Sequence, residues 1–214
     1  MKENKMTAMV QPAPFWDKIA DKYAKSPIAD VPTYEHTMAR TRAFLKPTDR
    51  VLELGCGTGS TALLLAPSVA QVTGTDISGE MVRIANDKAA DQGAQTVTFE
   101  QAASDADAFP AQSFDAVLGY NLLHLLEAPM RTVLRAHSLL KPGGVFITKT
   151  PCLGDSGFVL RLMIPVMQML GKAPFVGFPT AEGLETMLRT AGFEVIASET
   201  HGKARNRFLV AQKL

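Results

Sequence analysis

Residues 51–59 read Val-Leu-Glu-Leu-Gly-Cys-Gly-Thr-Gly. The largely apolar run at 51–54 predicts a buried parallel strand. Gly55, Gly57 and Gly59 follow at alternate positions, and glycines allow both a sharp turn and a close approach between backbone and ligand. The segment 61–66 comes directly afterwards and predicts a helix. A strand, a glycine turn and a helix N-terminus together predict a site for a nucleotide-like ligand.

The segments that follow this stretch alternate between strand and helix patterns. Strands are predicted at 71–76, 97–101, 114–120 and 145–150, and helices at 79–91, 129–140 and 181–191. This alternation predicts a parallel, doubly wound sheet with right-handed crossovers. Two final β-like runs, 194–199 and 207–211, have no helix between them, and a short loop joins only antiparallel neighbours. We therefore expect an α/β fold with a mostly parallel seven-stranded sheet and an antiparallel strand near one edge.

Composition and charge limit the classes of function. The chain has 214 residues, of which 46% are hydrophobic and 20% charged, and its formal net charge is +1. That charge gives no electrostatic reason to expect a nucleic-acid partner. Two cysteines, Cys56 and Cys152, are too few for a disulfide framework. The N-terminus lacks the apolar core of a signal peptide, and the apolar segment 158–170 is too short to span a bilayer. We expect a cytoplasmic protein without stable membrane insertion.

Two acidic residues distinguish between kinds of nucleotide-like ligand. Asp76 is expected at the end of the second strand, where a carboxylate can accept hydrogen bonds from ribose hydroxyls. Glu53 lies two residues before the first glycine and would repel an anionic pyrophosphate. The third glycine, Gly59, also comes one position earlier than in the dinucleotide fingerprint. Both features disfavour a nicotinamide-dependent dehydrogenase and favour a ligand with a cationic amino-acid portion.

With these glycines and acidic residues the chain resembles the class I S-adenosylmethionine-dependent methyltransferases. The resemblance extends from about residue 15 to residue 213, and its first motif is Glu-x-Gly-x-Gly-x-Gly at 53–59. Three further motifs follow in family order: Thr-Asp-Ile-Ser at 75–78 with Met81, the acidic loop at 105–110 with the strand entry at 113–117, and Leu-Leu-Lys-Pro-Gly-Gly at 139–144. The similarity to quinone C-methyltransferases is confined to the cofactor half of the chain.

The resemblance implies a Rossmann-like methyltransferase fold and a donor site for S-adenosyl-L-methionine, whose product is S-adenosyl-L-homocysteine. Glu53 would orient the methionine portion and Asp76 the ribose, while Asp105 would accept a hydrogen bond from the adenine amino group. The other residues that the resemblance places around the donor are Gly55, Cys56, Gly57, Gly59, Ile77, Met81, Ala106, Asn121, Leu122 and the covering residue Tyr23.

Several of these residues have simpler structural explanations. Met81 can belong to the core, and Tyr23 can pack within the helical cap. Asp105 and Asp107 lie in the same polar loop, and either could be solvated; the distance of Asp105 from Pro110 favours Asp105.

The resemblance also implies one domain over residues 1–214. We divide it into an N-terminal tail and helical cap (1–46), a cofactor-binding core (47–151), a substrate-lid insertion (152–179) and a C-terminal helix with a strand pair (180–214). Within the cap, helices are predicted at 15–24 and 33–45, after a lead-in over residues 1–14. The insertion is apolar and rich in methionine, which suits an adaptable lid over a hydrophobic small molecule. The alternative is that it packs on the core or on a second copy of the chain in a homodimer.

Methyl transfer needs chiefly an aligned nucleophile, because a sulfonium methyl is already electrophilic. A base is needed only when the acceptor carries a proton that must leave. His124 follows the fourth strand and is the candidate base, although it lies among leucines and can simply pack there. No His/Cys spacing suggests zinc, so we expect no metal site.

These observations predict transfer of a methyl group to a small, partly apolar acceptor, on oxygen, nitrogen or carbon. The alternative is a protein of the same fold that binds the cofactor without transferring the methyl group.

Overall fold

The computed structural model describes residues 12–155, 158–169, 173–202 and 206–214. The described strands form one seven-stranded sheet in the order β3-β2-β1-β4-β5-β7-β6. β7 runs antiparallel to both of its neighbours, whereas the other adjacent strands pair in parallel. The predicted fold is therefore confirmed, with β7 as the antiparallel strand next to the edge. The strands are β1 (Arg50–Leu54), β2 (Gln71–Asp76), β3 (Val97–Gln101), β4 (Phe114–Tyr120), β5 (Leu140–Pro151), β6 (Phe193–His201) and β7 (Asn206–Lys213).

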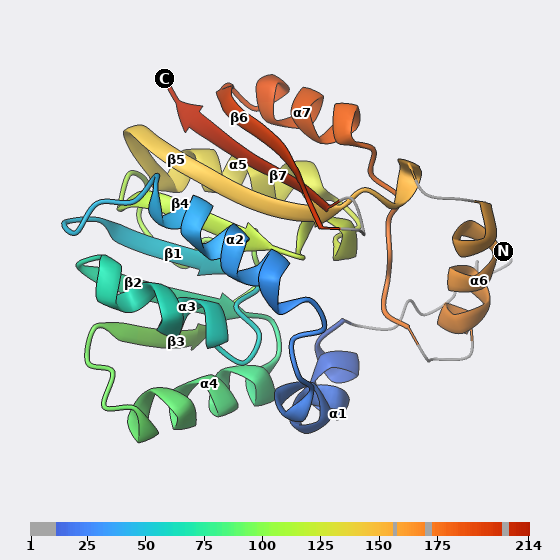
Figure 1. Ribbon diagram of the computed structural model, residues 1–214, viewed down its shortest axis with the longest axis horizontal. Helices are drawn as coiled ribbons and strands as arrows, with labels where there is room; N and C mark the ends of the chain where they lie inside the picture. Colours follow the sequence, from blue (N-terminus) through green and yellow to red (C-terminus); the bar gives the residue numbers. More distant parts are fainter. Residues whose placement is uncertain (1–11, 156–157, 170–172, 203–205) are drawn as a thin grey trace, which may run out of the picture.

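Helices cover both faces of the sheet (Figure 1). On one face α2, α3 and α4 contribute Met38, Leu65 and Ala85 to a core with β1, β2 and β4. On the other face, α5 and α7 contribute Val133 and Leu184 to a second core. The helices are α1 (Pro12–Lys25), α2 (Val31–Arg42), α3 (Ser60–Leu65), α4 (Gly79–Asp91), α5 (Pro129–Leu139), α6 (Phe158–Met169) and α7 (Ala181–Thr190), with short 3-10 turns η1 (Ala66–Ser68), η2 (Leu123–Leu125) and η3 (Leu153–Asp155).

Helix starts follow capping residues in the sequence. The Ser78 hydroxyl accepts from the Met81 amide at 3.1 Å, and the Thr180 hydroxyl accepts from the Gly183 amide at 3.0 Å. α2 begins at Val31 rather than at the predicted residue 33, because the Asp30 side chain caps it and Pro32 lies in its first turn. Proline is tolerated there since the first amides of a helix have no intrahelical partner.

Residues 141–144, which the sequence predicts as a turn before the fifth strand, lie within β5. The prediction started the fifth strand at residue 145, but β5 begins at Leu140, which pairs with Phe114. Val145 pairs with Ala116, so residues 141–144 form a bulge between two paired positions of one strand. Gly143 takes a positive φ of 76° at this bulge, which explains why a proline-glycine sequence lies inside a strand.

The insertion contains α6, which stands off the end of the sheet (Figure 1). A hydrogen bond from the Gly154 amide to the Pro179 carbonyl joins the two ends of the insertion. A second bond, from the Gly177 amide to the His124 carbonyl at 2.7 Å, ties the insertion to η2. Leu170 and the side chains of residues 158–162, which the prediction included in an apolar lid, lie outside the described residues, as does most of the lead-in at 1–14. Among the helices of the described ranges, none has the length and apolar character needed to cross a membrane.

Candidate functional site

A cavity of about 260 Å³ lies at the carboxyl ends of β1, β2 and β4. This is the edge of an open α/β sheet where ligands bind. Its wall contains every residue that the sequence placed around the donor except Gly59 and Ala106. The wall consists of Trp16, Tyr23, Glu53, Gly55, Cys56, Gly57, Thr61, Asp76, Ile77, Met81, Ala102, Ala103, Ser104, Asp105, Tyr120, Asn121, Leu122, Leu125 and Leu126.

Glu53 places a carboxylate in an unusual environment. The residue is 2% exposed, and among the described residues its Oε2 has no hydrogen-bond partner. Burial raises the pKa of Glu53 to about 8, although the Ala62 amide at the start of α3 opposes the shift, and the Asp76 carboxylate adds to it. An unpaired buried carboxylate oxygen is costly. This oxygen can therefore receive a cationic or hydrogen-bond-donating group from a ligand in the cavity.

The glycine turn is joined to the end of β2 through Asp76. Its carboxylate accepts from the Gly57 amide at 2.9 Å and from the Ser78 amide at 2.9 Å. Burial raises the pKa of Asp76, and these backbone donors oppose that rise. A carboxylate oxygen has more than one lone-pair site. Asp76 can therefore hold the turn and still accept ribose hydroxyls.

The three glycines share one reason to lack a side chain, and Gly59 has a second. All three take positive φ angles, of 67° at Gly55, 53° at Gly57 and 76° at Gly59. A Cβ at Gly59 would lie 2.6 Å from the Phe99 ring and 2.9 Å from the Ala85 methyl. Gly59 therefore serves close contact between the turn, α4 and β3, which accounts for its position outside the cavity wall.

α1 forms one side of the cavity with Trp16 and Tyr23. The Asp17 carboxylate accepts from the Ser78 hydroxyl at 2.6 Å and the Glu80 amide at 3.2 Å, so α1 is bound to the start of α4. Tyr23 is 51% exposed, but its ring lies above the turn, 3.8 Å from where a Cβ on Gly57 would stand. Partial burial raises the pKa of the Tyr23 hydroxyl, and the carboxylates of Asp76 and Glu53 raise it further.

β4 delivers two residues to the cavity. Tyr120 is buried, and its hydroxyl lies 2.6 Å from the Thr41 Oγ1 of α2. Thr41 already donates to the Thr37 carbonyl, so the tyrosine is the donor in this pair. Asn121 follows with a positive φ of 51°, a conformation that asparagine tolerates, and this turns the chain at the cavity edge.

The acidic loop is held by two arginines of α5. The Asp105 carboxylate lines the cavity and pairs with Arg131 at 3.0 Å. Arg135 donates to the carbonyls of Ala106 and Phe109 and pairs with the exposed Asp107. Ala106 therefore belongs to the support of the loop rather than to the cavity wall.

His124, the candidate base, is not among the residues that line the cavity. Its ring is partly buried, and among the described residues its Nδ1 has no hydrogen-bond partner. Burial lowers the pKa of His124 to about 4, so the ring is neutral at pH 7. Proton removal by His124 stays a prediction.

Sequence reasoning did not identify several cavity residues. Trp16, Thr61, Tyr120, Leu125 and Leu126 line the wall as well. Tyr120 and Leu125 flank the predicted Asn121 and Leu122, so their position after the fourth strand was a usable signal. Trp16 reaches the site only because α1 folds back onto α4, which no local pattern reveals.

A second cavity of about 310 Å³ adjoins the first and shares Ser104, Asp105, Leu125 and Leu126 with it. Phe175, from the segment after α6, and Arg131 contribute to its wall. The shared residues connect the donor cavity with the insertion.

Comparisons with known proteins agree with this geometry. A family model described as a methyltransferase domain matches residues 29–198. The ubiquinone biosynthesis O-methyltransferase of Xanthomonas axonopodis pv. citri is 32% identical over 158 residues, which are 72% of this chain and 66% of that protein. The uncharacterized methyltransferase YcgJ of Bacillus subtilis is 34% identical over 98 residues, which are 46% of this chain and 39% of that protein. The chain thus spans less than two thirds of the length of either curated relative.

Solved structures show the same fold. The crystal structure of YcgJ from Bacillus subtilis superposes with a TM-score of 0.70 at 18% identity, covering 84% of this chain and 98% of that chain. An S-adenosylmethionine-dependent methyltransferase from Methanosarcina mazei gives a TM-score of 0.69 at 22% identity, covering 82% and 97%. The domain match extends over more than half of the sequence, and its fold and motifs agree with it. The chain therefore belongs to the class I S-adenosylmethionine-dependent methyltransferase family.

Proposed function

We propose that this chain transfers a methyl group from S-adenosylmethionine to a small, partly apolar acceptor. The observation that carries the proposal is the buried, unpaired Oε2 of Glu53 in the wall of the cavity. A carboxylate at this place suits the cationic amino group of the donor and would repel the pyrophosphate of a dinucleotide.

The other residues of the wall fit the remaining parts of the donor. Gly55 and Gly57 would let the methionine portion lie against the backbone, and Asp76 would receive the ribose hydroxyls. Asp105 would accept from the adenine amino group while it keeps its contact with Arg131. Ile77 and Met81 offer apolar surface for the adenine ring, and Met81 also packs in the core with Ala20 and Ile84.

When bound, the donor supplies an electrophilic sulfonium methyl group. The chain then has to exclude water and hold the acceptor in line with that methyl group. Trp16 and Tyr23 cover one side of the cavity, and Leu122, Leu125 and Leu126 form an apolar wall on another. Asn121 also lines the cavity and can orient a polar acceptor atom. A base is required only for an acceptor that loses a proton.

The acceptor class follows from this lining and from the relatives. Curated relatives named ubiquinone biosynthesis O-methyltransferase and demethylmenaquinone methyltransferase align over 158 and 140 residues. An aromatic acceptor that carries hydroxyl groups and an apolar substituent suits the leucine wall and Phe175 of the second cavity. We propose that the acceptor lies between Asn121 and this second cavity, with the insertion as its cover. A homodimer and the absence of a nucleic-acid partner stay predictions.

Calorimetry with S-adenosylhomocysteine tests the donor site on the purified chain. We expect binding to the wild type and roughly 10- to 100-fold weaker binding to Glu53→Gln, the loss typical of a charge-assisted hydrogen bond. Incubation with S-adenosylmethionine and a panel of catechols and hydroquinones, followed by mass spectrometry, tests transfer. Failure of the folded wild type to bind would refute the proposal. Binding without methylation of any acceptor would favour the alternative, a cofactor-binding protein without transfer activity.

A further inference from the structure

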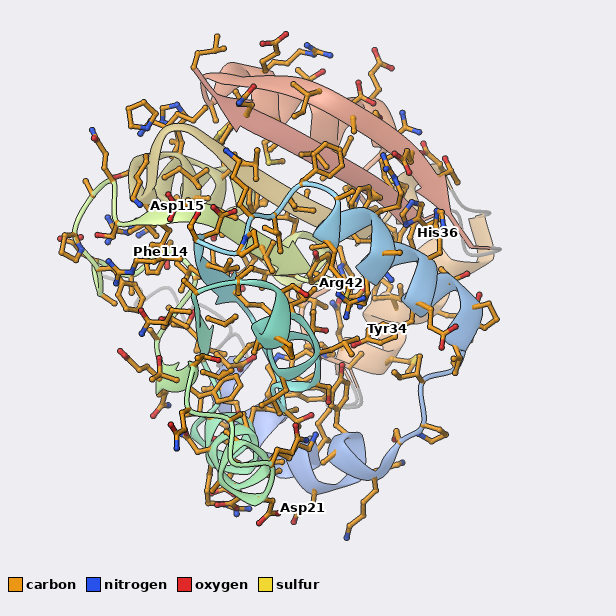
Figure 2. All side chains as sticks on the ribbon, turned by 60° about the vertical axis from the view of Figure 1, so that its left-hand side comes forward. Asp21, Tyr34, His36, Arg42, Phe114 and Asp115 are labelled. Atoms are coloured by element: carbon orange, nitrogen blue, oxygen red, sulfur yellow. The ribbon has the colours of Figure 1, made fainter. Side chains whose placement is uncertain are left out.

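Two histidines and a glutamate meet between α2 and β6, outside the donor cavity. His36 comes from α2, and Glu199 and His201 come from the end of β6. Their ligand atoms all lie within 4.8 Å of one another. Figure 2 shows His36 on α2, on the side where β6 ends and β7 begins. His36 is exposed and His201 is buried, so the cluster extends from the surface into the interior.

The His201 ring is held by four neighbouring side chains. Its plane stacks on the Phe208 ring with 4.7 Å between centroids, and the His36 ring meets it edge-on at 4.6 Å. Nδ1 lies 3.0 Å from the Thr37 Oγ1, and Nε2 lies 3.1 Å from the Glu199 Oε2. Nε2 therefore faces a carboxylate oxygen and has little freedom to turn away.

The protons can be arranged in two ways. The Thr37 hydroxyl donates its one proton to the Thr33 carbonyl at 2.8 Å, in which case Nδ1 of His201 must donate to Thr37. In a neutral ring Nε2 is then a lone pair that faces the Glu199 carboxylate, and both atoms are acceptors. In the other arrangement Thr37 turns its proton to Nδ1, and Nε2 donates to Glu199. The first arrangement leaves a place for a cation, and His36 stands at that place as a third acceptor.

The surrounding contacts resemble the support that metal ligands receive. Arg40 holds Glu199 through its Nε, 3.1 Å from each carboxylate oxygen, and through a second nitrogen on Oε1. Thr37 would hold the other nitrogen of His201 and fix its tautomer. Among the described residues, the cations Arg40 and Lys149 and the anion Glu199 act on this cluster, and Asp30 lies close enough to Lys149 to oppose its charge.

We propose that His36, Glu199 and His201 form a Zn²⁺ site that ties α2 to β6. Two imidazoles and a carboxylate are ligands that Zn²⁺ accepts, with a water molecule as the fourth. Zn–N and Zn–O bonds of about 2.0–2.2 Å place tetrahedral ligands about 3.4 Å apart. The His201 Nε2 and the Glu199 Oε2 are close to this spacing at 3.1 Å, and rotation of the exposed His36 side chain would supply the remaining approach. The site would stabilise α2, whose Thr41 contacts the cavity residue Tyr120.

Zinc titration of the full-length chain, freed of metal with a chelator, tests the site. We expect calorimetry to show one Zn²⁺ per chain and zinc to raise the melting temperature. His36→Gln alters an exposed side chain, so it should fold normally and bind zinc at least about tenfold more weakly. His137→Gln is the matched control, because His137 lies on α5 at the opposite face of the sheet, and it should bind zinc as the wild type does. Cobalt substitution should give the visible absorption of tetrahedral coordination in the wild type and not in His36→Gln.

Three outcomes would overturn the proposal. They are no stoichiometric zinc binding by the wild type, equal affinity in His36→Gln, or an equal loss of affinity in His137→Gln. Nitrogen NMR of His201 adds an independent measurement, since zinc must move the Nε2 resonance more than that of Nδ1. None of these measurements requires methyl transfer, so they stand whether or not the proposed function does.

Discussion

The Gly57 amide donates to the Asp76 carboxylate at 2.9 Å, so the glycine turn after β1 and the end of β2 form one hydrogen-bonded unit. The same carboxylate accepts from Ser78, which begins α4. Asp76→Asn replaces an acceptor oxygen with a donor that faces an amide. We expect the free energy of unfolding to fall by about 1–3 kcal/mol and the affinity for S-adenosylhomocysteine to fall with it. Urea denaturation and calorimetry measure the two effects.

Asp107→Asn provides the control for that variant. Asp107 belongs to the acidic loop, its side chain is 94% exposed, and its partner is Arg135. Stability should change by less than about 0.5 kcal/mol. Equal effects of the two substitutions would contradict a special role for Asp76.

Glu53 should make stability depend on pH between about 4.5 and 8. Its pKa is about 8 in the folded chain and 4.5 when unperturbed, so between these values the folded state binds more protons than the unfolded state. Stability from this group is complete below pH 4.5 and is lost as the pH rises through 8. His124 acts in the opposite direction below pH 6.5, because its folded pKa is about 4.

Comparison with Glu53→Gln from pH 6.5 to 8 isolates the glutamate, because both proteins contain the same other titrating groups. We expect the wild type to lose roughly 2 kcal/mol relative to Glu53→Gln across that window. Urea denaturation of both proteins at several pH values measures the difference. Parallel stability curves would show that Glu53 is ionised already at pH 6.5.

Ligand binding should release a proton at pH 7. The Glu53 carboxyl is mostly protonated there, and a cationic amino group beside its Oε2 would lower its pKa. Calorimetry with S-adenosylhomocysteine in buffers of different ionisation enthalpy should show release of close to one proton per ligand. Glu53→Gln should abolish the buffer dependence, and a wild type without buffer dependence would place the amino group elsewhere.

Substitution of two glycines with the same φ angle distinguishes the cost of backbone strain from the cost of side-chain crowding. Gly59 and Gly143 both have φ of 76°, but a Cβ at Gly143 meets nothing within 4 Å, whereas a Cβ at Gly59 meets Phe99 and Ala85. Gly143→Ala should cost about 1–2 kcal/mol of stability from the left-handed conformation. Gly59→Ala should cost this amount and about 1–3 kcal/mol more from overpacking. Equal losses in denaturation experiments would mean that α4 and β3 move apart without cost.

His124→Gln tests the candidate base. Because the ring is outside the cavity wall and a pKa of about 4 makes it a weak base, we expect kcat to fall less than about tenfold once an acceptor is known. A base in the reaction is worth about 10²–10⁴-fold. A loss of that size, with KM unchanged and stability retained, would restore the catalytic role of His124.

Strand positions were predictable because buried strands and capped helices leave local signals. Val51 to Leu54 and the Ser78 cap are examples in which the sequence pattern and the structure agree. The start of β5 was not predictable, because Lys141 to Gly144 have the composition of a turn. They form a bulge only because Leu140 finds Phe114 on β4 as its partner.

The site also combines residues with local sequence signals and residues that depend on distant partners. Glu53 and Asp76 lie at the carboxyl ends of β1 and β2, and Asn121 directly follows β4, so their meeting at one edge follows from the parallel sheet. Trp16 reaches the cavity because α1 is bound to the start of α4. The hydrogen-bonded residues, Asp17 and Ser78, are 61 positions apart in the sequence. His36 and His201 meet across an even longer separation, which explains why ligand spacing along the chain indicated no metal.

The attachment of α1 to α4 has a kinetic consequence. Asp17 holds α1 against Ser78, and Asp21 lies 3.9 Å from Arg83, while Trp16 and Tyr23 of the same helix border the cavity. A molecule in the cavity gains these aromatic contacts only while α1 is docked, so occupancy and docking favour each other. We therefore expect that weakening the Asp17–Ser78 contact lets α1 undock more often and shortens the residence time of an occupant before it alters the shape of the cavity.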